Sequence, residues 1–77
     1  MIYVIAYLMN KKPFLFYHSD KRLYGSISDN ICVYKSLATA KRTFSKIYLK
    51  GREFAILEVG DDDGFDEGKV VFYKRCI

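Results

Sequence analysis

One amphipathic segment, residues 36–51, is the sequence feature that most limits how this chain can fold. Its apolar side chains recur at helical spacing and so share one face of a helix; they are Leu37, Ala40, Phe44, Ile47 and Tyr48. Ser36 is suited to cap the N-terminus of this helix. Gly51 is suited to end it, because glycine adopts the left-handed conformation without a steric penalty. We therefore predict a helix over residues 37–50.

The rest of the chain is dominated by runs of β-branched and aromatic residues, the residue types that favour strands. Polar, Gly- and Asn-containing stretches separate these runs and predict turns, among them the turn 10–13 and the loop 20–30. The runs that we expect to be strands are residues 1–9, 14–19, an optional short strand at 23–27, 31–35, 52–59 and 69–76. The first two and the last two each predict a hairpin.

This order, β-β-(β)-β-α-β-β, predicts a single α+β domain over residues 1–77. We expect two layers, an antiparallel sheet of four to five strands and one helix, because one helix covers only one face of such a sheet. The second face then has two interpretations. It is either an apolar interface, for a homodimer or another partner, or part of a strongly twisted sheet wetted by Tyr hydroxyls and Lys stems.

Composition narrows the class of protein further. Of the 77 residues 51% are apolar and 17% aromatic, which is too apolar for a disordered chain. No apolar run reaches the roughly 20 residues that span a bilayer, and residues 1–9 lack the features of a signal peptide. We therefore expect a cytoplasmic protein without membrane contact. Cys32 and Cys76 are expected to be reduced thiols in apolar surroundings, although the sequence leaves a disulfide between them open.

An acidic stretch at residues 61–67 holds five of the nine acidic residues, although the net charge is +4. Its spacing does not match a calcium loop, and its flanks are strands rather than helices, so we expect no metal and no cofactor. The stretch is either a solvated hairpin turn or a protein-binding loop for a basic groove, with one aromatic anchor. The candidate protein-binding residues are Asp61, Asp62, Asp63, Phe65, Asp66 and Glu67.

Residues 35–52 contain six basic side chains and no acidic one. Arg42, Lys46 and Lys50 are four residues apart and would line one face of the expected helix. Such a row could follow nucleic-acid phosphates, although no known nucleic-acid-binding signature accompanies it. The other interpretation is a solvated helix face. The candidate nucleic-acid-binding residues are Lys35, Lys41, Arg42, Lys46, Lys50 and Arg52.

Catalytic residues are scarce in this sequence. His18 is the single histidine, and its neighbour Ser19 would point to the opposite face of a strand. A nucleophile and its base must instead converge in space. We therefore expect no catalytic residue and no enzymatic activity.

The segments VYKSLATAKR and FAILEV combine a strand, a Ser-capped helix and a second strand. This pattern, over about half of the chain, resembles small proteins of phages and mobile elements, including anti-CRISPR inhibitors. The resemblance implies a compact, non-enzymatic inhibitor or regulator that occludes a host protein, and it transfers no functional residue. A nucleic-acid-binding module remains the alternative.

Overall fold

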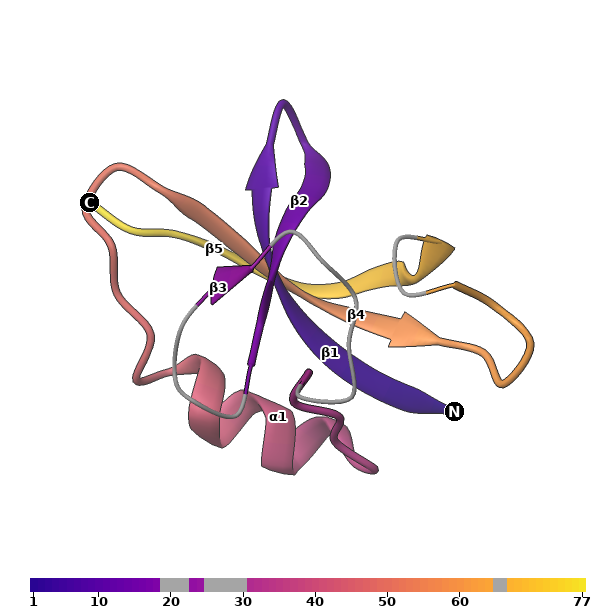
Figure 1. Ribbon diagram of the computed structural model, residues 1–77. Coiled ribbons are helices and arrows are strands. Elements are labelled where there is room, and N and C mark those ends of the chain that lie inside the picture. The colour runs from indigo at the N-terminus through magenta and orange to yellow at the C-terminus, as the bar shows by residue number, and fades with distance from the viewer. Residues whose placement is uncertain (19–22, 25–30, 65–66) are drawn as a thin grey trace.

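The computed structural model describes residues 1–18, 23–24, 31–64 and 67–77, and in them the chain forms one antiparallel sheet and one helix. The expected α+β fold of two layers is confirmed: helix α1 (Leu37–Phe44) lies against one face of a five-stranded sheet (Figure 1). The strand order is β3-β2-β1-β4-β5. The strands are β1 (Ile2–Met9), β2 (Lys12–Tyr17), β3 (Leu23–Tyr24), β4 (Glu53–Val59) and β5 (Lys69–Arg75).

The expected first hairpin is present as β1 and β2, joined by the two-residue turn Asn10–Lys11. Both turn residues have positive φ, 54° and 64°, as the favoured two-residue hairpin turns require. Pro13 was expected in the turn but lies in β2 opposite Leu8. It is tolerated there because β3 pairs only with Phe16 and Tyr17, so the missing N–H of Pro13 faces no described neighbour.

Residues 31–35 were expected to form a strand, and this prediction is wrong. Only two isolated bridges occur in this stretch, from Ile31 to His18 and from Tyr34 to Tyr3. Tyr34 exchanges two backbone hydrogen bonds with Tyr3, of 2.8 and 2.9 Å. The segment thus crosses from the end of β2 to the start of β1, and it runs alongside neither strand for long enough to form a ladder.

Helix α1 begins where the sequence predicts and ends six residues earlier than expected. The Oγ atom of Ser36 accepts a hydrogen bond from the backbone N–H of Thr39, at 3.3 Å, which confirms the cap. At the other end, Lys74 of β5 donates to the backbone carbonyls of Phe44, at 2.6 Å, and Ile47. The backbone N–H groups of Lys46 and Ile47 donate to Thr43, at 3.0 Å, and to Phe44, at 3.2 Å, so the chain after α1 tightens into i→i−3 bonds. Lys74 adds a charged donor to the carbonyls at this end of the helix.

Apolar side chains are buried on both faces of the sheet. On the α1 side, Phe44 packs with Ile5, Phe54, Ile56 and Cys76. On the other side, side chains that are at most 1% exposed form a second cluster that includes Val4, Ala6, Ala55, Leu57 and Val59. The expectation that the second face lacks cover within the chain is therefore wrong.

Twist of the sheet accounts for burial on both faces. Figure 1 shows β1 curving from the N-terminus, past β4, into a hairpin that stands upright over the β4–β5 pair. Phe16 of β2 and Ile31 join the second cluster, because a coiled sheet folds part of itself over its own face. The structure thus supports a strongly twisted sheet, but apolar side chains of the same chain, rather than Tyr hydroxyls and Lys stems, cover this face.

Candidate binding surfaces

The hairpin between β4 and β5 ends in an acidic tip, which we define as Asp61, Asp62, Asp63 and Glu67. Asp63 donates its backbone N–H to the carbonyl of Gly60, at 3.1 Å, and Glu67 donates to Gly64, at 3.0 Å. These turns satisfy the backbone locally, and all four acidic side chains are exposed. Phe65 and Asp66, which were also predicted to bind a protein, lie outside the described residues.

The carboxylates of the acidic tip are mostly not neutralised by the protein. The N-terminal ammonium of Met1 lies 3.5 Å from Oδ1 of Asp61, but the Asp61 side chain is 85% exposed. Such a surface ion pair contributes at most about 1 kcal/mol. Among the described residues, Asp62, Asp63 and Glu67 have no ion-pair partner, so their charges face solvent.

The six predicted nucleic-acid-binding residues do not form a single row. Lys41 and Arg42 lie in α1, and Lys46 belongs to the turn that follows it. Lys50 and Arg52 flank Gly51, beyond the end of the helix, while Lys35 precedes the cap. All six side chains are exposed, but Arg42, Lys46 and Lys50 do not share one helix face, because α1 ends at Phe44.

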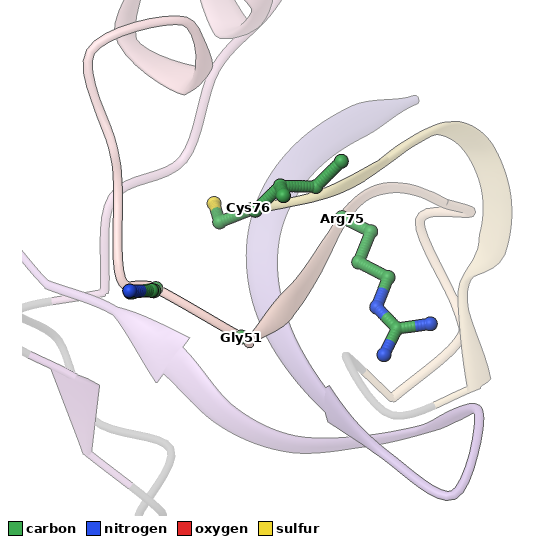
Figure 2. A pocket seen from close by; sticks show the side chains of 5 residues that line it. Gly51, Arg75 and Cys76 are labelled. Carbon is green, nitrogen blue, oxygen red and sulfur yellow. The ribbon is translucent and has the colours of Figure 1, made fainter.

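The structure instead gathers cations around Gly51, in what we call the basic end: Lys11, Lys50, Arg52 and Arg75. Two open hollows meet at Gly51. One, of about 350 Å³, is lined in part by Lys11 and Arg52, and the other, of about 340 Å³, by Lys50 and Arg75. Figure 2 shows Gly51 beside the C-terminal segment, with the side chains of Arg75 and Cys76 on opposite sides of the chain.

Backbone hydrogen bonds hold this end together. The N–H of Gly51 donates to the carbonyl of Cys76, at 2.9 Å, and the N–H of Cys76 donates to Arg52, at 2.8 Å. Gly51 has a φ of 79°, which glycine adopts without strain. The guanidinium of Arg52 also lies 5.9 Å from the centre of the Tyr7 ring. The predicted set missed Lys11 and Arg75, which reach this end only through the strand order.

The acidic tip and the basic end lie at opposite ends of β4. This strand runs from Glu53, next to Arg52, to Val59, next to the tip. Its seven residues, at ~3.3 Å each, separate the two charged groups by about 20 Å. That distance is beyond the screening length at physiological ionic strength, about 8 Å, so the two groups act as separate surfaces.

The residues that commonly carry chemistry are scattered. Among residues 1–18, 23–24, 31–64 and 67–77, no three His, Cys, Asp or Glu side chains gather in a way that would hold a metal ion. His18 is buried. Cys32 and Cys76 are free thiols, and Cys76 packs in the apolar cluster beneath α1. In the described part of the chain, no helix is long and apolar enough to cross a membrane.

Comparison with known proteins adds no relative. No protein-family model matches this chain, and no curated protein and no solved structure shows significant similarity to it.

Proposed function

We propose that this chain is a non-enzymatic binding protein whose acidic tip occupies a basic groove on another protein. The observation that carries this proposal is the placement of the tip. Its carboxylates are exposed at the end of a hairpin, about 20 Å from the protein's own basic end by the length of β4. Charges held apart in this way remain free for a partner instead of pairing within the molecule.

Electrostatic attraction would guide such an encounter. Several exposed carboxylates at the end of one hairpin present negative charge to a basic partner, and complementary potentials raise association rates. By analogy with the small phage proteins that the sequence resembles, we propose an inhibitor or regulator in the host-cell cytoplasm. It would act by covering a groove that its host protein uses for an anionic ligand.

The decisive experiment compares two variants with the same net charge. Asp62→Asn with Asp63→Asn removes two charges from the tip, whereas Ala38→Lys with Leu49→Lys adds two positive charges at exposed positions elsewhere. Proteins captured from a host lysate by the wild type are purified and titrated by calorimetry. We expect the tip variant to lose about tenfold in affinity, or 1.4 kcal/mol, and the control to lose far less.

Thermal unfolding of both variants verifies that they remain folded. Equal affinity of the folded tip variant and the wild type for each purified partner would remove the acidic tip from the proposal.

A second candidate function, nucleic-acid binding, is favoured by the basic end. Lys11, Lys50, Arg52 and Arg75 surround two adjoining hollows, and such a cluster suits phosphate groups. Gel-shift titration with DNA and RNA at low and high salt tests this function. If it holds, Lys50→Gln with Arg52→Gln should weaken binding far more than Lys35→Gln with Arg42→Gln, which removes the same amount of charge before and within α1. No binding at low salt would exclude it, because phosphate contacts are strongest there.

A further inference from the structure

A second surface, independent of the acidic tip, lies along the outer edge of β5. The strand order places β5 last, and among the described strands it pairs only with β4. Seven residues are long for an open edge, since proteins usually shorten or cover such strands. The edge therefore offers backbone groups that an extended peptide can bind.

The hydrogen bonds of Cys76 identify the β5 residues whose backbone groups face the open edge. Its N–H and C=O both bond toward the start of β4, to Arg52 and Gly51. Backbone direction alternates along a strand, so Lys74 also faces β4. Tyr73 and Arg75 then present their N–H and C=O groups to the open edge.

The two faces of this edge differ in chemistry. On the α1 side, Phe72 is opposite Ile56 and is 40% exposed, and Nζ of Lys41 lies 4.5 Å from the centre of its ring. Lys69 lies on the same side, opposite Glu58. On the other side Val70 is 44% exposed and Tyr73 is 48% exposed, and the exposed Arg75, opposite Glu53, follows at the end of the strand. Lys41 and Lys69 thus provide cations on the α1 side, whereas the other side offers apolar surface from Val70 to Tyr73 and a cation only at its end, Arg75.

A second copy of the chain is a poor occupant. If two β5 strands paired, the cations of both copies, Lys69 and Arg75 on each, would gather along one seam. Like charges brought together across an interface disfavour association. The same cations suit the edge to a partner of opposite charge.

We propose that the edge of β5 binds an extended peptide in which acidic and apolar side chains alternate. The peptide would extend the sheet through the backbone of Tyr73 and Arg75, as peptides do when they add a strand to a sheet. Its acidic side chains would lie on the α1 side, near Lys41 and Lys69. Its apolar side chains would pack on Val70 and Tyr73.

The test uses a fluorescent, end-blocked peptide of alternating valine and glutamate, with a valine–lysine peptide as its control. Tyr73→Pro removes the outward N–H without touching the bonds to β4, because proline is tolerated at an outward-facing edge position. Tyr73→Ala removes the same ring but keeps the N–H. In polarisation titrations we expect Tyr73→Pro to bind at least about tenfold more weakly than Tyr73→Ala, a difference of 1.4 kcal/mol.

A charge variant, Lys41→Glu with Lys69→Glu, should lose the acidic peptide while keeping the fold. Three results would each overturn the proposal. The wild type does not bind the valine–glutamate peptide, it binds the valine–lysine peptide equally well, or Tyr73→Pro and Tyr73→Ala bind the valine–glutamate peptide with equal affinity. A wild-type dimer in light scattering that Tyr73→Pro dissociates would also overturn it and make a second copy the occupant. Asp62→Asn with Asp63→Asn should leave all these measurements unchanged, so this inference and the proposed function can be overturned independently of each other.

Discussion

Tyr3 and Glu58 show how one polar pair on the sheet links stability to pH. The Tyr3 hydroxyl donates a hydrogen bond to Oε2 of Glu58, at 3.2 Å. This bond to a carboxylate, together with partial desolvation and the negative charge of Glu58, raises the pKa of Tyr3 above 10.0. A folded-state pKa above the unfolded value stabilises the fold below pH 10. That contribution is lost as the pH rises through the folded pKa.

We predict that Glu58→Gln lowers the pKa of Tyr3, because the charge that opposes tyrosinate is gone. In alkaline absorbance titrations, this variant should shift one late-titrating tyrosine to lower pH, and Tyr3→Phe should remove it. The pKa of Tyr73 is raised by burial and then by its hydrogen bond to Glu53. Tyr73 is therefore the reference tyrosine, which should still ionise at high pH in both Glu58→Gln and Tyr3→Phe. The interpretation fails if the alkaline curve of Glu58→Gln superimposes on that of the wild type.

The elements show which parts of the fold local sequence determines. The strand runs other than 31–35, the first hairpin, the second hairpin and the cap at Ser36 are local features, and the structure confirms them. The end of the helix is not local. Apolar spacing continues to Ile47 and Tyr48, but the carbonyls of Phe44 and Ile47 accept hydrogen bonds from Lys74, about 30 residues away. No helix signal within residues 36–51 contains that information.

Lys74 should therefore contribute to stability through the end of α1. Its ammonium also lies 4.8 Å from the centre of the Phe44 ring. Lys74→Met keeps the alkyl stem but leaves two carbonyls without their charged donor, which typically costs about 1–3 kcal/mol. Urea denaturation measures the free energy of unfolding. Lys69→Met, an exposed position on the same strand, is the control and should change it by no more than about 0.5 kcal/mol; equal losses in the two variants would contradict the role given to Lys74.

At the scale of the whole molecule, close packing of the β4–β5 hairpin at Gly68 helps to cover the second face of the sheet. A Cβ atom on Gly68 would lie 2.9 Å from Cβ of Leu57 and 2.9 Å from Cγ2 of Val59. The backbone at Gly68 thus packs directly on the second apolar cluster. This contact depends on how the β4–β5 hairpin bends, which alternating residues in a sequence do not reveal.

Gly68→Ala should consequently destabilise the protein by about 1–3 kcal/mol, the usual range for overpacking a core. Gly60→Ala in the same hairpin is the matched control, because its Cβ would meet only the carboxylate of Asp63, a flexible side chain that can move aside. Calorimetric unfolding compares the two. A Gly68→Ala protein as stable as Gly60→Ala would show that the hairpin does not press on this face.

Strand order also limited how much of the candidate surfaces the sequence could predict. Asp61, Asp62, Asp63 and Glu67 are neighbours in the chain, so the acidic tip needed no tertiary information. The basic end joins Lys11, Lys50, Arg52 and Arg75, and it exists only because β1 and β5 flank β4. Burial of the second face likewise removes the reason for expecting a dimer there.

The separation of charge along β4 has a practical consequence for any measurement on a solid support. On a carboxylated sensor chip or a cation-exchange resin, the protein should adsorb by its basic end, with the acidic tip directed into solution. On an amine-bearing support the orientation should reverse and bury the tip. The two immobilisation chemistries would thus expose two different ends of the same protein to an analyte. Comparing the binding signals on the two supports would show which end the analyte recognises, without any substitution.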